Sequence, residues 1–402
     1  KIEGAKPIEL HQLYRALGWL GEEIEEQIPV LDEAQKGIEK ISRRCIKDEI
    51  EEELFRRRRD LFSSCELVFF DTTSIYFEGE GGEEIGVYGK SKDHRPDLRQ
   101  MVVGVVLDNK GHPICCELWP GNTTDVQTLL PVVERLEQRF GIKRICLVAD
   151  RGMISKKTIT QLEACNYGAD YILGARMRAQ KEVRENVLTA EGEFEEIFPE
   201  RIRSNDPSPL KVKEVKIDNH RYIVCINEEQ ARKDKADREA IILSLQEKLK
   251  KGDKSLIGNK GYRRYLKTKG SCFSIDEERI KKESLYDGKW VLRTNTQLTA
   301  KEAALKYKQL WMVEEIFRSM KSILETRPIY HKCDETIRGH VFCSFLALIL
   351  RKELQDRIQQ KGWLNIEWHD IINDLNELHE IEETFSGKKF IFRLALKKIK
   401  LS

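Results

Sequence analysis

The chain has 402 residues, of which 40% are hydrophobic and 34% are charged, and its formal net charge is +2. This length predicts two or three domains, and the composition is typical of a folded protein with a polar surface. The longest strongly apolar stretch, from Val341 to Leu350, excludes a membrane-spanning helix, which needs about 20 apolar residues. The small net charge neither requires nor excludes nucleic acid, so any DNA-binding surface has to be local.

The ten cysteines are scattered along the chain, and none of them forms a C-x-x-C pair. This spacing supports neither a zinc site nor a disulfide framework, and it predicts free thiols in a reducing cytosol. No signal-peptide pattern opens the chain, so we expect a cytoplasmic protein. The chain begins at Lys1 rather than Met and already reads as helix, which predicts a truncated N-terminus.

The chain is predicted to be helical up to about residue 60, and its character changes at Glu66. From there, runs rich in β-branched and aromatic residues predict three strands, and Asn109-Lys110-Gly111 predicts a hairpin between the second and the third. Two amphipathic helices alternate with two buried strands after them. These elements are expected at 67–77, 101–108, 113–120, 125–140, 144–150, 155–165 and 169–175. The order β-β-β-α-β-α-β is that of a ribonuclease-H-like core.

Residues 176–289 interrupt this pattern with a charged, proline-punctuated stretch. The later elements are expected at 212–218 and 221–227 (strands), 227–249 (helix), 290–295 (strand), 299–324 and 338–361 (helices) and 389–396 (strand). We therefore predict an α/β fold, a ribonuclease-H-like mixed sheet flanked by helices and interrupted by an inserted domain of strands and helix. The predicted domains are an N-terminal helical region (1–62), a catalytic domain in two parts (63–175 and 290–360), the insertion (176–289) and a C-terminal region (361–402).

Two aspartates occupy positions where a charged group is costly. Asp71 lies in the middle of an apolar strand, and Asp150 stands at the end of a buried one. A buried carboxylate is unfavourable unless it is paired or bound to metal, although hydrogen-bonded structural aspartates are also common. Because the first and fourth strands are neighbours in this topology, both carboxylates are expected at one edge of the sheet.

Glu314 is the candidate for a third acid, on the helix expected at 299–324. It lies on a polar stripe with Tyr307, Arg318 and Lys321, beside the apolar stripe that packs on the sheet. The alternative is a surface pair of Glu314 and Arg318, one turn apart, worth a few tenths of a kcal/mol. Its neighbour Glu315 lies about 100° round the helix and off this stripe, so Glu314 is preferred.

Three converging carboxylates need cations, because their mutual repulsion would otherwise raise their pKa values. Mg²⁺ prefers oxygen ligands and keeps several waters, so a few carboxylates are enough. Two such ions about 4 Å apart serve in-line phosphodiester cleavage. Asp71, Asp150 and Glu314 are therefore the predicted catalytic and metal-binding residues, with Mg²⁺ as the cofactor and Mn²⁺ as its substitute.

Three segments resemble bacterial insertion-sequence transposases of the DDE class, in the superfamily with a Y-x2-R-x3-E-x6-K signature. They are FFDTTSIYFE around Asp71, VADRGM around Asp150, and YKQLWMVEEIFRSMK, which begins at Tyr307. Tyr, Glu and Lys of the signature are present, but Leu310 stands where the signature has Arg. Arg318 is then expected to take over the phosphate contact. The segment from 86 to 100 is also similar to a segment of the family.

The resemblance covers residues 10–395 and implies properties that spacing alone does not. It implies magnesium dependence, action on double-stranded DNA (terminal inverted repeats and target), and a homodimer in the synaptic complex. It also implies a bacterial, nucleoid-associated protein.

Basic and aromatic side chains near the predicted acidic edge are candidates for DNA contact, since Lys and Arg there gain affinity by releasing counterions. The candidates are Lys90, Lys92, His94, Arg95, Arg99, Arg151, Trp290, Tyr307, Arg318 and Lys321. For the 86–100 segment, a solvated loop is the alternative. Tyr307 is expected to stack on or hydrogen-bond to the DNA end. Two roles are open for Trp290. It could stack on a flipped DNA base, as an insertion-domain tryptophan does in relatives of the family, or it could pack in the sheet.

The sequence thus predicts a transposase that cuts transposon ends and uses the freed 3′-hydroxyl to attack target DNA. No Gly-rich phosphate loop is present, so no nucleotide cofactor is expected. Three alternatives stay open: a ribonuclease-H-like nuclease without strand transfer, an inactive transposase-derived DNA-binding protein, and an interaction scaffold built on the lysine-rich insertion. The intact set of three acids argues against lost chemistry.

Overall fold

The computed structural model describes residues 8–24, 43–58, 67–142, 145–164, 169–198, 209–250, 262–269, 272–362, 368–376, 380–385 and 388–393. The chain divides into two compact units, Lys1–Leu348 and Ile349–Ser402. The boundary falls within helix α10 (Asp334–Gln360). The domain boundaries expected from the sequence stay a prediction.

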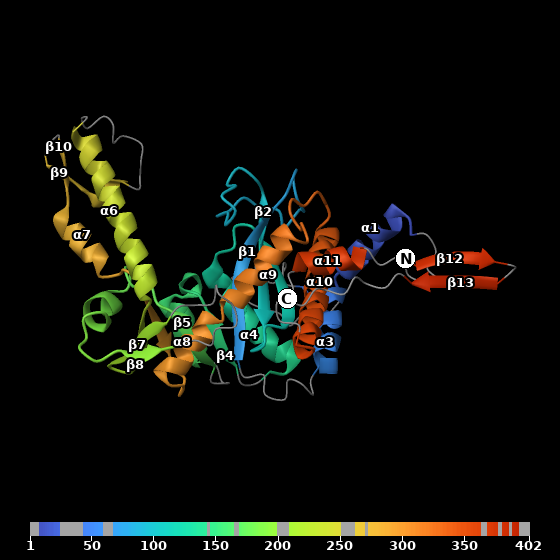
Figure 1. Cartoon of the computed structure of the whole chain (residues 1–402), viewed down its shortest axis with the longest axis horizontal. Coiled ribbons are helices and arrows are strands. Elements are labelled where there is room, and N and C mark those ends of the chain that lie inside the picture. Colours follow the sequence, from blue (N-terminus) through green and yellow to red (C-terminus); the bar gives the residue numbers. More distant parts are fainter. Residues whose placement is uncertain are drawn as a thin grey trace. The chain divides into compact units, whose positions relative to one another are not determined.

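A nine-stranded mixed sheet forms the centre of the first unit, in the order β3-β2-β1-β4-β5-β11-β8-β7-β6 (Figure 1). The strands are β1 (Leu67–Tyr76), β2 (Gln100–Leu107), β3 (Pro113–Pro120), β4 (Cys146–Ala149), β5 (Asp170–Gly174), β6 (Glu195–Ile197), β7 (Leu210–Ile217), β8 (His220–Ile226) and β11 (Lys289–Thr294). Strand β1 pairs antiparallel with β2 and parallel with β4, and β4 pairs parallel with β5. The first five strands therefore have the predicted ribonuclease-H-like order, with β1 beside β4.

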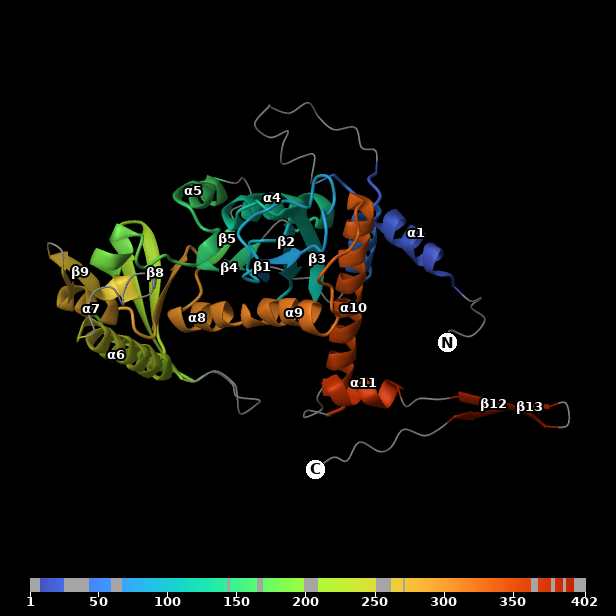
Figure 2. The same ribbon diagram turned by 90° about the horizontal axis from the view of Figure 1, so that it is seen from above.

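Helices cover both faces of the sheet (Figure 2). The helical elements that begin in the first unit are α1 (Leu10–Leu20), α3 (Ile46–Arg58), α4 (Asp125–Phe140), η2 (Arg151–Met153), α5 (Lys156–Ala164), η3 (Val183–Val187), α6 (Glu228–Lys250), η5 (Tyr262–Tyr265), α7 (Glu277–Ser284), α8 (Ala300–Lys308), α9 (Trp311–Ser322) and α10. Helices α4 and α5 lie on one face, and α8 and α9 lie on the other. The part of residues 7–60 between 25 and 42 lies outside the described residues.

The alternation of side chains along β1 divides the core between these two layers. Val68 and Phe70 belong to the cluster that α4 and α5 cover, together with Leu129 of α4. Ile75 belongs to the opposite cluster, with Met320 of α9. Fully burying side chains of this kind stabilises the fold by about 1.5–3 kcal/mol each. Apolar contacts thus hold β1 on one face before its polar residues 71–74 and on the other face after them.

The ends of α4 follow from local chemistry and match the predicted range. Thr124 and Gln127 form a capping box at its N-terminus. Gly141 closes the helix with a left-handed backbone (φ 64°), which glycine adopts without steric cost. The first residue of this helix, Asp125, consequently has a fixed place at one end of the sheet.

Strands of the predicted insertion join the central sheet, because β11 pairs with both β5 and β8. The insertion also contains α6, α7 and a separate hairpin of β9 (Leu266–Lys269) and β10 (Cys272–Ile275). Leu245, Tyr265 and Leu266 form a small core there. The predicted start of α6 is confirmed by Asn227, whose Oδ1 accepts a hydrogen bond of 3.0 Å from the backbone N–H of Gln230.

The single helix expected at 299–324 is in fact two helices, α8 and α9. Between them, the backbone N–H groups of Gln309 and Leu310 bond to carbonyls three residues earlier, which makes a tight turn. Helix α8 packs on β4, β5, β7 and β8, whereas α9 packs on β1 and β2. The two helices therefore cover different strands of the sheet.

The second unit contains the rest of α10, α11 (Trp368–Asn376) and the antiparallel pair β12 (Glu380–Phe385) and β13 (Lys388–Arg393). Strand β13 corresponds to the strand expected at 389–396, of which the residues after 393 lie outside the described part. Within the described residues, none of the helices combines the length and apolar character needed to cross a membrane. The cysteines at 45, 115, 116, 146, 225, 333 and 343 are free thiols, as predicted.

Candidate active site

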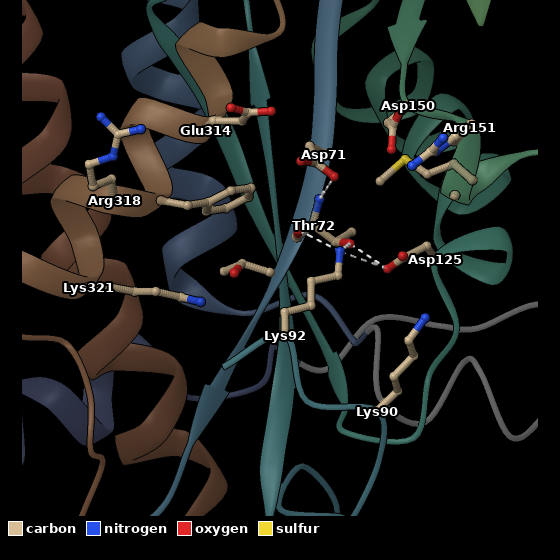
Figure 3. A pocket seen from close by; sticks show the side chains of 14 residues that line it. Asp71, Thr72, Lys90, Lys92, Asp125, Asp150, Arg151, Glu314, Arg318 and Lys321 are labelled. Carbon is tan, nitrogen blue, oxygen red and sulfur yellow. Dashed lines mark hydrogen bonds and ion pairs between the residues drawn. The ribbon is translucent and has the colours of Figure 1, made fainter. Parts of the chain in front are cut away.

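The candidate site lies where β4 ends beside β1. The last parallel pair between these strands joins Phe70 to Ala149. Beyond this pair, the described strands leave β1 without a neighbour on that side. Asp71 and Thr72, which point to opposite faces of β1, therefore both reach one cavity of about 490 Å³ (Figure 3).

The three predicted acids all line this cavity, although they come from distant parts of the chain. Asp71 is on β1, Asp150 directly follows β4, and Glu314 is in the first turn of α9. Burial raises the pKa of Asp71 to about 6; Asp150 and Asp125 add to the rise, and Lys92 and the Thr72 N–H oppose it. The cavity thus brings a partly buried carboxylate together with two exposed ones.

The donor set of the cavity fits a hard divalent cation, because the acids offer only oxygen ligands. Among the described residues, no three His, Cys, Asp or Glu side chains are close enough to hold one ion together. The acids come from separate walls of the cavity instead (Figure 3). Asp71 lies on β1, Asp150 follows the end of β4, and Glu314 lies on α9.

Tyr307 fixes one of the acids. Its Oη donates a hydrogen bond of 2.9 Å to Oδ1 of Asp150. Burial, with the nearby charge of Asp150, raises the pKa of Tyr307 well above its usual range, so the hydroxyl stays a donor. The close approach requires Gly174 at the end of β5, since a Cβ there would lie 2.5 Å from Oη of Tyr307.

Five of the predicted DNA contacts line the cavity: Lys90, Lys92, Arg151, Arg318 and Lys321. Lys90, Arg151 and Arg318 are exposed. Lys321 differs, because its ammonium lies 2.8 Å from Oδ1 of Asp93 and its side chain is only 13% exposed. The cavity therefore contains exposed cations together with one that is mostly buried and ion-paired.

The other predicted DNA contacts lie outside the cavity lining. Arg95 makes a two-pronged ion pair with Asp97. Arg99 donates a hydrogen bond of 2.9 Å to the carbonyl of Glu80, and His94 is exposed. The role of these residues in DNA binding stays a prediction.

Trp290 stands on β11 opposite Cys225 of β8. Its indole N–H is buried and has no hydrogen-bond partner among the described residues. The position is consistent with packing in the sheet, the plainer of the two expected roles, and stacking on a base stays a prediction.

Sequence reasoning missed Asp125, a fourth carboxylate on the cavity wall. Its Oδ1 accepts a hydrogen bond of 2.6 Å from Oγ1 of Thr72 and forms an ion pair of 3.1 Å with Lys92. An Asp in the first turn of a helix is common for reasons of the helix dipole, so nothing local distinguished it. The signal that could have found it is topological: α4 begins at the same end of the sheet at which β4 ends.

No curated protein sequence matches the chain at a significant level. Among solved structures, it is similar to a piggyBac transposase synaptic complex with hairpin DNA, with a TM-score of 0.39 and 11% identity over 76% of this chain and 52% of that chain. It is also similar to a Mos1 transposase paired-end complex with the left transposon end (TM-score 0.20, 17% identity, 38% of this chain and 45% of that chain). A Mos1 mariner paired-end complex with Mn gives a TM-score of 0.19 and 18% identity, over 37% of this chain and 46% of that chain. The chain spans about half the length of these proteins.

These structural similarities are too distant to assign the chain to a family, but a family profile does so. The profile described as the transposase DDE domain matches residues 64–350, well over half of the chain. This range contains β1, β4 and α9, and with them Asp71, Asp150 and Glu314. The chain belongs to the DDE transposase family.

Proposed function

We propose that this transposase cuts the ends of a DNA element and joins the freed 3′-hydroxyl to target DNA, with two divalent cations held by Asp71, Asp150 and Glu314. The observation that carries the proposal is that these three acids line one open cavity together with exposed cations. Phosphodiester chemistry needs both: acids that bind metal, and cations that bind the phosphate on which the metal acts.

The residues of the chain have distinct tasks in this proposal. Asp71 lies in the middle of β1, directly after the pairing with β4 stops, and the Thr72 N–H donates a hydrogen bond of 2.7 Å to its Oδ1. Tyr307 orients Asp150 through the hydrogen bond to Oδ1. When bound, Mg²⁺ or Mn²⁺ would activate the attacking oxygen and stabilise the leaving one. No nucleotide cofactor is required for this chemistry.

The exposed cations of the cavity are the proposed phosphate contacts. Lys90, Arg151 and Arg318 approach it from a loop, from η2 and from α9. Arg318 lies one turn after Glu314 on the same helix, so it stands in for the arginine that the signature has at position 310. We also propose a homodimer that pairs two terminal inverted repeats, which rests on membership of the family.

Cleavage of the element's own ends tests the assignment of the acids. A duplex that carries the terminal sequence is incubated with Mg²⁺ and either the wild type, Glu314→Gln or Glu315→Gln. We expect cleavage by the wild type and by Glu315→Gln, since Glu315 does not line the cavity, and none by Glu314→Gln. Equal cleavage by all three proteins would remove Glu314 from the site.

Joining is tested separately, with a pre-cut end that has a free 3′-hydroxyl and a supercoiled target plasmid. Joined products support a transposase. Cleavage without joining would instead identify a ribonuclease-H-like nuclease, and binding without either reaction would identify a transposase-derived DNA-binding protein.

A further inference from the structure

Lys92 lies in the cavity, but its ammonium group is bonded and charge-paired within the protein. Its Nζ donates hydrogen bonds to the carbonyl of Thr72 (2.8 Å) and to Oγ1 of Thr72 (2.7 Å). It also forms an ion pair of 3.1 Å with Oδ1 of Asp125. An ammonium group has three N–H donors and no acceptor, so two of the donors are bonded to Thr72 and the charge is paired with Asp125.

The contacts of Lys92 form a closed triangle with Thr72 and Asp125 (Figure 3). The hydroxyl of Thr72 accepts from Lys92 and donates to Asp125, at 2.6 Å. Each group is therefore oriented by the other two, and the charges of Lys92 and Asp125 cancel. Their side chains are about one third exposed (35% and 30%), so solvent screens the pair only in part.

The backbone around Lys92 is anchored as well. The N–H of Lys92 donates a hydrogen bond of 2.8 Å to Oγ of Ser74 on β1. The next residue, Asp93, forms ion pairs with Lys321 of α9 (2.8 Å) and with Arg327 (2.6 Å). Adjacent loop residues thus tie β1 to α4 on one side and to α9 on the other.

Lys90, two residues earlier on the same loop, provides the contrast. Both lysines line the cavity and are exposed, but Lys90 makes no hydrogen bond or ion pair with the described residues. A phosphate can approach Lys90 without breaking any contact. At Lys92, a phosphate would have to displace Asp125 or Thr72.

We propose that Lys92, Thr72 and Asp125 form a brace that positions Asp71, and that Lys92 acts inside the protein instead of binding a DNA phosphate. The brace acts on Asp71 through Thr72, whose backbone N–H donates to the Asp71 carboxylate and whose carbonyl accepts from Lys92. Beyond Phe70 this part of β1 has no pairing with β4, so it needs another support on that side. Asp125 is then a partner of Lys92 and not an additional metal ligand. The proposal rests on the function proposed above.

The decisive experiment compares Lys92→Met with Lys90→Met in DNA binding without divalent metal, over a series of salt concentrations. Each phosphate contact contributes about 0.9 to the slope of log K against log salt. We expect Lys90→Met to bind more weakly and to lose about one unit of slope. Lys92→Met keeps the wild-type affinity, within about twofold, and the wild-type slope. A loss of affinity and slope in Lys92→Met equal to that in Lys90→Met would overturn the brace.

The kinetic readout is the maximal rate of end cleavage. Lys92→Met, Asp125→Asn and Thr72→Val are each expected to lower kcat by about 10- to 100-fold with KM unchanged, as for the loss of a charge-assisted hydrogen bond. Thr72→Ser keeps the hydroxyl and retains most of the activity. The double variant of Lys92→Met with Asp125→Asn is no worse than the poorer single one, because both break the same triangle. Additive losses, or Thr72→Ser as poor as Thr72→Val, contradict the proposal.

Two further measurements separate this proposal from the proposed function. Mn²⁺ titration is expected to give near-wild-type affinity in Asp125→Asn, whereas a loss as large as in Asp71→Asn makes Asp125 a metal ligand and ends the proposal. Hydrogen exchange of residues 86–100 in the DNA-free protein is expected to rise in Lys92→Met but not in Lys90→Met. This readout decides on the brace even if the wild type does not cleave DNA, an outcome that counts against the proposed function alone.

Discussion

The hydroxyl of Tyr307 lies 2.9 Å from Oδ1 of Asp150 and donates a hydrogen bond to it. Tyr307 stands near the end of α8, and Asp150 follows β4 directly. The first residue of the family signature thus contacts the second acid of the site. In this structure its hydroxyl is engaged within the protein, so its task is to orient a carboxylate in addition to any contact with a DNA end.

Removal of this hydroxyl is expected to slow the reaction without unfolding the protein. Tyr307→Phe keeps the ring but loses a hydrogen bond to a charged group, which is worth about 1.5–3 kcal/mol. We predict a fall in kcat for end cleavage of about 10- to 100-fold, measured at saturating Mg²⁺. Tyr330→Phe is the control, because Tyr330 is 70% exposed. Unchanged kcat in Tyr307→Phe would contradict the orienting role.

Gly174→Ala is predicted to have the same effect by a different route. The added methyl group would lie 2.5 Å from Oη of Tyr307 and 3.0 Å from the backbone nitrogen of Arg151, so the tyrosine has to move away from Asp150. Cleavage by Gly174→Ala should fall at least as far as in Tyr307→Phe. The double variant should cleave DNA about as slowly as the poorer single variant, since both substitutions remove the same hydrogen bond between Tyr307 and Asp150. Fully additive losses would indicate that Gly174 acts elsewhere.

Binding of divalent metal is predicted to stabilise the wild type against unfolding. Mn²⁺ at 100 times its dissociation constant adds about 2.7 kcal/mol to the free energy of unfolding when one site is filled. A thermal melt with and without Mn²⁺ measures this gain, and EDTA reverses it. Asp71→Asn should lose the gain. If it retains the full shift, the metal binds outside the proposed site.

Arg139 is predicted to be critical for stability. It is only 11% exposed and joins α4 to α3 and β3 through ion pairs with Asp48, Glu51 and Glu117. Its loss weakens the pairing of these buried carboxylates, although Asp48 and Glu51 keep Lys47 and Glu117 keeps Arg135. We therefore expect a cost of about 3 kcal/mol, the lower end of the range for a broken buried pair. Urea unfolding of Arg139→Met should show this loss. Arg57→Met is the control, because Arg57 is 77% exposed and its pair with Glu53 should contribute little.

The ion pairs around Arg139 also predict that the stability of the protein depends on pH. Burial by itself raises the pKa of Asp48, but Lys47 and Arg139 outweigh it and lower this pKa to about 2. The carboxyl is therefore a stronger acid in the folded protein than in the unfolded chain. The contribution of Asp48 to the free energy of unfolding is fully present above the usual pKa of an aspartate, about 4, and is lost as pH falls toward 2. Urea unfolding between pH 5 and pH 2.5 should be less pH-dependent in Asp48→Asn than in the wild type; equal dependence would contradict the prediction.

Much of the fold could be predicted from the sequence because its causes are local. Apolar and β-branched runs form β1, β2 and β3, and Asn109 to Gly111 forms the turn between the last two. Thr124 and Gly141 bound α4, since capping and a left-handed turn depend on a few neighbouring residues. The break between α8 and α9 could not be predicted, because neither Gly nor Pro marks the turn at Gln309 and Leu310.

The acids of the site could be selected from the sequence, because a carboxylate in an apolar strand is costly wherever that strand lies. Asp71 and Asp150 stand out for this reason, and helical spacing separates Glu314 from Glu315. Asp125 does not stand out, because an acid at the start of a helix has an ordinary local explanation. Its place on the cavity wall depends on where α4 begins relative to β1.

By itself, the sequence predicted the five strands of the ribonuclease-H-like core, the bounds of α4 and the three acids that line the cavity. Only the tertiary structure decided which charges face one another. Lys90 and Lys92 look alike in the sequence and both are exposed, yet only Lys92 is held by Thr72 and Asp125 among the described residues. The physical reason is that a charge interacts over a few ångströms in space, and that distance is set by the packing of distant segments, not by separation along the chain.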